Sequence, residues 1–215
     1  MGLFDIFKKR GDNGAKASTT PTNSSTSTPP SHLTKSYQAQ TIGKPSIAKV
    51  SDMIDFGLKW QEKFLEDCFS FPSSSVKAEA LMFTCWRVWY HCLENNVVSR
   101  DQSYVSEFFA HIMTYEQSYD ARFDDINFFM PLFKNRYGIF RSDLVGLCNS
   151  NFPVTKQYLP ISTYRVFFVE PLEVIDPSTS TISSLSTGQM DEMTEFLDKF
   201  IMLSNAMTKE LDDVF

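Results

Sequence analysis

One charged side chain interrupts the most apolar segment of the sequence. Arg87 lies within residues 80–90, where nearly every other side chain is apolar. An unpaired charge there would be costly, so we expect its guanidinium to meet a carboxylate or reach water. A structural ion pair is favoured over an anion-binding group. Candidate partners are acidic residues of other turns and segments: Glu79, Glu107, Glu116, Asp124 and Asp125.

Two short histidine–carboxylate pairs have the spacing of metal ligands on a helix. Glu107 and His111 are four residues apart, and His91 and Glu94 are three apart. Each pair supplies two ligands, whereas a closed site needs about four. The Glu-x-x-His pairs of di-iron bundles do not occur in the sequence. We therefore predict no metal and no other cofactor.

The four cysteines are expected to be buried, reduced thiols. Cys85 and Cys92 lie two helical turns apart, about 10 Å, which is too far for a disulfide. Cys68 and Cys148 stand alone in the sequence. With no secretory signal, this cysteine usage predicts a cytoplasmic protein.

The first ten residues combine apolar and basic side chains. The segment contains Leu3, Phe4, Ile6 and Phe7, followed directly by Lys8, Lys9 and Arg10. A short amphipathic helix of this kind suits an anionic membrane surface, here the inner face of a membrane, or a docking site on a partner protein. With about one turn of contact, we expect weak and reversible binding.

Charge and composition divide the chain near residue 45. Residues 1–45 carry six Lys or Arg against two Asp, whereas residues 46–215 carry 14 basic against 24 acidic residues. An acidic body repels phosphate, so nucleic-acid binding is not expected. Residues 11–45 hold 13 Ser or Thr and four Pro, a composition typical of a disordered linker.

Apolar residues recur with helical spacing from Ser46 onward. They predict helices over about 46–69, 75–93 and 100–118. Ser75 is the expected N-cap of the second helix, and a capping box of Ser99 and Gln102 is expected to open the third.

The clearest helical pattern lies in the fourth predicted helix, about 123–147. Its apolar residues alternate steps of three and four: Phe123, Ile126, Met130, Phe133, Tyr137, Phe140, Leu144 and Leu147. Pro131 lies inside this pattern, so we expect a kink or two shorter helices joined there.

The C-terminal part is less regular. Residues 164–169 are β-branched and aromatic, which suits a strand, but a lone strand lacks a partner, so a short buried helix is an equal alternative. Ser186 and Gln189 form another candidate capping box, followed by a last helix to about Val214. Its apolar side contains Met190, Met193, Leu197, Phe200, Leu203, Met207 and Leu211.

Together these patterns predict an all-α bundle of five or six helices behind a disordered tail. The organisation is a 1–10 docking segment, an 11–45 linker and a 46–215 bundle. No phosphate-binding loop or hydrolase motif occurs. We therefore expect a non-enzymatic protein-interaction module. The alternatives are a ligand-binding or catalytic pocket at Trp86, Arg87 and Trp89, and a homo-oligomer.

Overall fold

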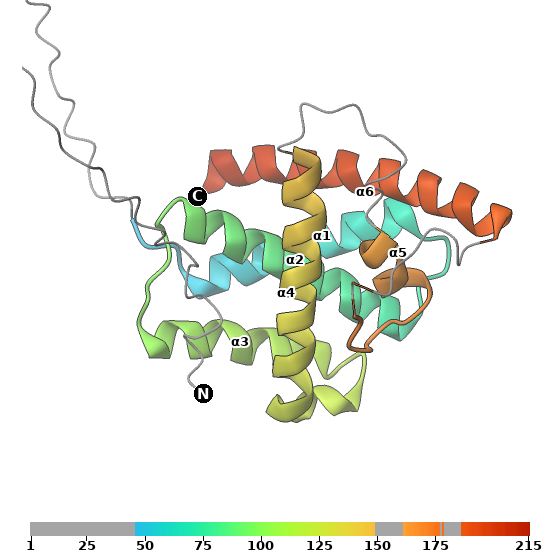
Figure 1. Cartoon of the computed structure of the whole chain (residues 1–215). Helices are drawn as coiled ribbons and strands as arrows, with labels where there is room; N and C mark the ends of the chain where they lie inside the picture. Colours follow the sequence, from blue (N-terminus) through green and yellow to red (C-terminus); the bar gives the residue numbers. More distant parts are fainter. Residues whose placement is uncertain (1–45, 149–160, 177, 179–185) are drawn as a thin grey trace, which may run out of the picture. The chain divides into compact units, whose positions relative to one another are not determined.

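The computed structural model describes residues 46–148, 161–176, 178 and 186–215. These residues form six α-helices and one short 3-10 helix, without any strand (Figure 1). The elements are α1 (Val50–Cys68), α2 (Ser74–Glu94), α3 (Gln102–Glu116), η2 (Ala121–Asp124), α4 (Ile126–Cys148), α5 (Ile161–Phe168) and α6 (Thr187–Val214). The predicted all-α class is thus confirmed for the described part. The predicted docking segment and linker lie outside it.

Helices α1 and α2 approach each other closely. At Gly57 of α1, an added Cβ atom would lie only 2.8 Å from Cys85 Sγ of α2, so a larger residue would not fit without movement. The N-cap of α2 is Ser73, whose Oγ accepts a hydrogen bond of 3.2 Å from Val76 N. The expected cap, Ser75, lies inside the helix instead.

Helix α3 begins without the expected capping box. Its N-cap is Asp101, and no side chain caps the first turn by a hydrogen bond. Ser99 Oγ instead accepts from Asp101 N at 3.2 Å and donates to Asp101 Oδ2 at 2.9 Å. The box prediction was wrong because Ser99 bonds within the preceding turn, a local alternative open to short polar side chains.

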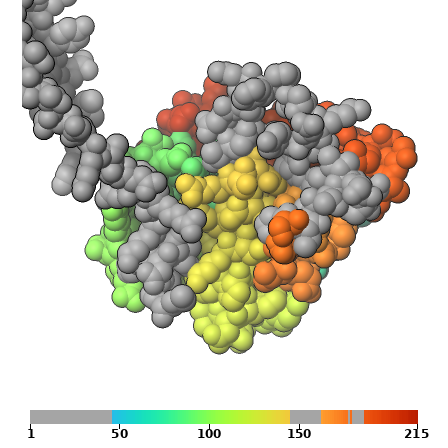
Figure 2. Space-filling view, viewed as in Figure 1, coloured from blue at the N-terminus to red at the C-terminus, as the bar shows by residue number. Residues whose placement is uncertain are grey.

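The fourth predicted helix is divided at Asp125. A 3-10 turn carries Phe123, and α4 then continues as one helix through Pro131, whose ring is exposed. Phe133 and Phe140 are buried as predicted, but Ile126 is 46% exposed. Figure 2 shows α4 across the middle of the viewed face, so one side of this helix stays in solvent.

The segment predicted to be either a strand or a short buried helix is a helix, α5. In α5, Tyr164, Val166 and Phe167 are all buried. Helix α6 begins with the predicted capping box: Gln189 N donates to Ser186 Oγ, and Ser186 N donates to Gln189 Oε1.

Aromatic rings from several helices build the core. The ring centroid of Phe64 in α1 lies 5.4 Å from those of Phe83 in α2 and Phe167 in α5. The centroid of Phe83 lies 4.6 Å from that of Phe200 in α6. Phe140 brings α4 to the same cluster, at 5.2 Å from Phe83. This ring cluster fixes the faces that α1, α2, α4, α5 and α6 turn inward.

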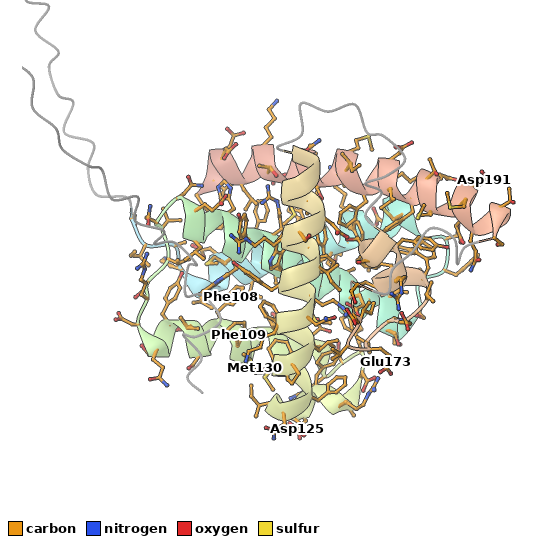
Figure 3. All side chains as sticks on the ribbon, in the orientation of Figure 1. Phe108, Phe109, Asp125, Met130, Glu173 and Asp191 are labelled. Carbon is orange, nitrogen blue, oxygen red and sulfur yellow. The ribbon has the colours of Figure 1, made fainter. Side chains whose placement is uncertain are left out.

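A second aromatic group attaches α3 to the bundle. Phe108 and Phe109 are neighbours on α3 and are labelled in Figure 3. The ring centroid of Phe108 lies 4.6 Å from that of Trp89 in α2, and the centroid of Phe109 lies 5.0 Å from that of Phe133 in α4. Helix α3 therefore packs against α2 and α4 together.

Candidate functional site

The most polar contact of the core is an ion pair between α2 and α4. Arg136 donates from Nε to Glu79 Oε2 at 2.8 Å and from a terminal nitrogen to Glu79 Oε1 at 2.6 Å. Both side chains are fully buried. This two-pronged geometry is the strong form of an arginine–carboxylate contact, and burial makes each partner depend on the other.

The same pair holds the segment that follows α5. Leu172 N donates to Glu79 Oε1 at 2.6 Å, and Leu172 has a φ of 63°, which is unfavourable for a residue with a Cβ atom. Asn135 accepts from Arg136 at 2.6 Å and binds the Ile175 backbone through both its oxygen and its nitrogen. The contacts of Glu79 and Asn135 thus keep residues 172–175 against α2 and α4.

A second carboxylate, Glu116 of α3, is buried near this pair. It is fully buried, and neither carboxylate oxygen has a hydrogen-bond partner in the described part. Burial raises the pKa of Glu116 well above that of an exposed glutamate, and the charge of Glu79 raises it further. Burial also raises the pKa of Glu79, an effect that the hydrogen bonds from Arg136 oppose. We call Glu79, Glu116 and Arg136 the buried carboxylate cluster.

Arg87 lies apart from the buried carboxylate cluster. It is half-buried on α2, and it donates a hydrogen bond to Thr208 Oγ1 of α6. Two of its predicted partners do not pair with it. Glu79 binds Arg136, and the oxygens of Glu116 have no hydrogen-bond partner in the described part. The anion-site prediction for Arg87 itself remains a prediction.

Trp86 and Trp89 do not face a common space. Trp86 packs on Tyr90 and Phe140 with centroid distances of 5.5 Å each, whereas Trp89 packs on Phe108 of α3. The two rings are 1% and 2% exposed. This packing gives no support to the alternative of a pocket between these tryptophans and Arg87.

His91 is also placed for a structural role. Its Nε2 lies 3.0 Å from Asn95 Nδ2, which can only donate, so the contact requires a neutral ring with Nε2 unprotonated. Asp212 of α6 lies 3.7 Å from the same nitrogen. Burial lowers the pKa of His91, and the Asp212 charge partly offsets this.

The described cysteines are unsuited to nucleophilic chemistry. Cys68, Cys85 and Cys92 are free thiols. Burial raises the pKa of Cys68 and of Cys92 to about 12, and it raises the pKa of Cys85 as well. Because the thiolate is the reactive form, these groups are inert at neutral pH.

The turn between α1 and α2 carries the most exposed of the large apolar side chains in the described part. Phe71 is 97% exposed there. Phe69, two residues earlier, is half-buried, and its ring centroid lies 5.4 Å from that of Phe168 at the end of α5. Val169, which follows Phe168 in the sequence, is 47% exposed. We call Phe69, Phe71, Phe168 and Val169 the Phe71 surface. It lies where the α1–α2 turn, α5 and the first half of α6 meet (Figure 1).

Acidic residues predominate around the Phe71 surface. They are Glu66 and Asp67 at the end of α1, Glu170 after α5, and Glu192 and Glu195 on α6. The basic residues at this end include Lys77 near the start of α2, Arg165, which pairs with Glu170, and Lys199, which pairs with Glu195 at 2.8 Å. Further from Phe71, Glu173 follows α5 and Asp191 lies at the start of α6 (Figure 3). The surroundings therefore keep a net negative charge.

Sequence reasoning did not identify Arg136 or Phe71. A signal for Arg136 was present, because it lies three residues after Phe133 and four before Phe140, on the face predicted to be buried. Phe71 stands in a Ser/Pro-rich turn, where no periodicity reveals whether a side chain is covered. The predicted docking residues, from Leu3 to Arg10, lie outside the described residues.

Within the described ranges, no group of three or more His, Cys, Asp or Glu side chains is arranged to hold a metal ion. None of the described helices combines the length and apolar character needed to cross a membrane. Comparison of the chain with protein-family models, curated proteins and solved structures finds no match.

Proposed function

We propose that residues 46–215 form a non-enzymatic protein-interaction module whose partner docks on the Phe71 surface. The observation that carries this proposal is the 97% exposure of Phe71 on a turn anchored by Phe69. Phe69 lies within 6.0 Å of rings on α1, α5 and α6. These contacts anchor the backbone of the turn next to Phe71, and aromatic residues commonly dominate binding energy at interfaces.

The partner is expected to offer an apolar pocket or helix face next to basic side chains. The ring of Phe71 supplies the apolar contact, and Val169 extends it. Asp67 and Glu195 are among the acidic residues at its edge. Opposite charges at the edge of an interface favour encounter and select among partners more than they add affinity.

The N-terminal decapeptide supports a second part of the proposal. Its apolar residues and the three basic residues Lys8, Lys9 and Arg10 suit weak attachment to an anionic membrane surface. A cytoplasmic protein held at the inner face of a membrane would then present the bundle to its partner through the Ser/Thr/Pro-rich linker.

The test is affinity capture from native lysate with three versions of the full chain. These are the unmodified chain, Phe71→Ser, and the control Met202→Ser, which alters a side chain of α6 that is 60% exposed. We expect one protein to be retained by the unmodified chain and by the control, and its dissociation constant to rise about 30-fold or more with Phe71→Ser. All three chains should unfold at the same temperature.

Sedimentation of the purified chain distinguishes a second copy from a different partner. Self-association that Phe71→Ser removes would identify the partner as another copy of this chain. Equal capture of the same protein by the unmodified chain and by Phe71→Ser would contradict docking on the Phe71 surface.

A further inference from the structure

We infer that Glu116 is a proton-binding site, occupied at neutral pH, whose proton stabilises the folded bundle. The inference is independent of the proposed function. It rests on three observations: the side chain is fully buried, both its oxygens lack a hydrogen-bond partner in the described part, and a second buried carboxylate lies near it.

The charges around Glu116 explain why it needs a proton. Arg136 is the one cation of the buried carboxylate cluster, and both of its hydrogen bonds to carboxylate go to Glu79. Arg136 gives its third hydrogen bond to Asn135, and Glu79 also accepts from Leu172 N. An ionised Glu116 would therefore add an uncompensated negative charge to the interior, a large free-energy cost in a protein core.

Other groups close to Glu116 in the fold or in the sequence do not compensate a negative charge on it. On α2, burial raises the pKa of the Cys85 thiol, and an ionised Glu116 would raise this pKa further. Beyond α3, the Tyr119 hydroxyl bonds with the side chain of Gln61 of α1. Asp120, the N-cap of η2, is paired with Arg122, and these side chains are 22% and 51% exposed. On α4, the buried Arg136 is paired with Glu79.

Proton binding at Glu116 has a defined effect on stability. The unfolded chain releases this proton near pH 4.3, whereas the folded chain retains it to higher pH. Above pH 4.3 the unfolded state thus binds fewer protons than the folded state, and stability falls as pH rises until the folded-state pKa is passed. The stability that the Glu116 proton contributes is fully present below pH 4.3, and it decreases as the pH rises through the neutral range.

The experiment compares the full chain with Glu116→Gln and with Glu62→Gln, which alters an exposed glutamate of α1. Urea unfolding is followed by tryptophan fluorescence from pH 5 to pH 8.5. Relative to Glu116→Gln, the unfolding equilibrium constant of the unmodified chain should rise by up to tenfold per pH unit. The Glu62→Gln control should follow the unmodified chain at every pH. Parallel curves for the unmodified chain and Glu116→Gln would overturn the inference.

Two measurements on the unmodified chain keep the test decisive if Glu116→Gln does not fold. Infrared spectroscopy should detect the carbonyl stretch of a protonated carboxyl group at pH 7 and its loss at alkaline pH. Its absence at pH 7 would overturn the inference. Unfolding at pH 7.5 should also be identical in sodium, potassium and choline chloride of equal ionic strength. Stabilisation by one of these metal ions would identify a cation, not a proton, as the occupant.

Discussion

Glu79 and Arg136 lie 57 residues apart in the chain, yet their side chains join α2 to α4 through two hydrogen bonds inside the core. The same glutamate fixes the backbone of Leu172. One buried ion pair therefore links α2, α4 and the segment after α5. Because each charge is fully buried, the loss of one partner leaves the other without compensation.

Removing only Arg136 should be more harmful than removing both charges. We expect Arg136→Met to lower the free energy of unfolding by about 3–5 kcal/mol, because Glu79 keeps an unpaired buried charge. The double variant Glu79→Gln/Arg136→Met should recover part of this loss, since no charge remains. Urea denaturation of Arg136→Met, Glu79→Gln and the double variant measures the difference. A double variant whose loss equals the sum of the two single losses would show that the two side chains are not coupled.

The aromatic residues of α4 should contribute strongly to stability where they are buried. Phe133 and Phe140 are 1% and 0% exposed, so truncating either to Ala should cost about 3–5 kcal/mol. Ile126 belongs to the same sequence pattern but is 46% exposed, and Ile126→Ala should cost less than about 1 kcal/mol. Chemical denaturation checks all three variants. Losses below about 1 kcal/mol at both phenylalanines would contradict their burial.

His91 should make the bundle less stable in acid. Burial lowers the pKa of His91, so the unfolded chain takes up a proton near pH 6.5 that the folded chain takes up only at lower pH. Stability from this residue is present above pH 6.5 and is lost as pH falls. The variant His91→Gln should therefore show a flatter stability profile from pH 7.5 to pH 5. The effect has the opposite sign to that of Glu116, and unchanged acid sensitivity in His91→Gln would rule it out.

The N-terminal segment should bind anionic vesicles. Each of Lys8, Lys9 and Arg10 is expected to contribute about 1 kcal/mol near an anionic surface, and salt should weaken the binding. Replacing Phe4 and Phe7 with Ser should abolish it, because their rings supply the apolar contact. Vesicle sedimentation measures both effects. Equal binding by the full chain and by a version without residues 1–10 would exclude this segment as a membrane anchor.

Local interactions made much of the helical architecture predictable. The spacing of apolar residues on α6 and the capping box of Ser186 and Gln189 involve residues within a few turns of each other, so the sequence displays them directly. The periodic pattern of α4 likewise placed Phe133 and Phe140 in the core correctly. Ser99 shows the limit of such signals. Its side chain was predicted to form a capping box with Gln102, but it accepts a hydrogen bond from Asp101 N in the preceding turn instead.

Tertiary structure decided which polar groups are buried and what they meet. Residues 161–168 form a helix that buries Tyr164 and Phe167 among rings of other helices, although their composition suited a strand equally well. The burial of Arg136 and Glu116 depends on side chains from other helices, brought together only by folding. A sequence pattern reports the period of an element and its apolar face. The partner of a buried charge, in contrast, lies tens of residues away and is selected by packing and by the cost of leaving that charge unpaired.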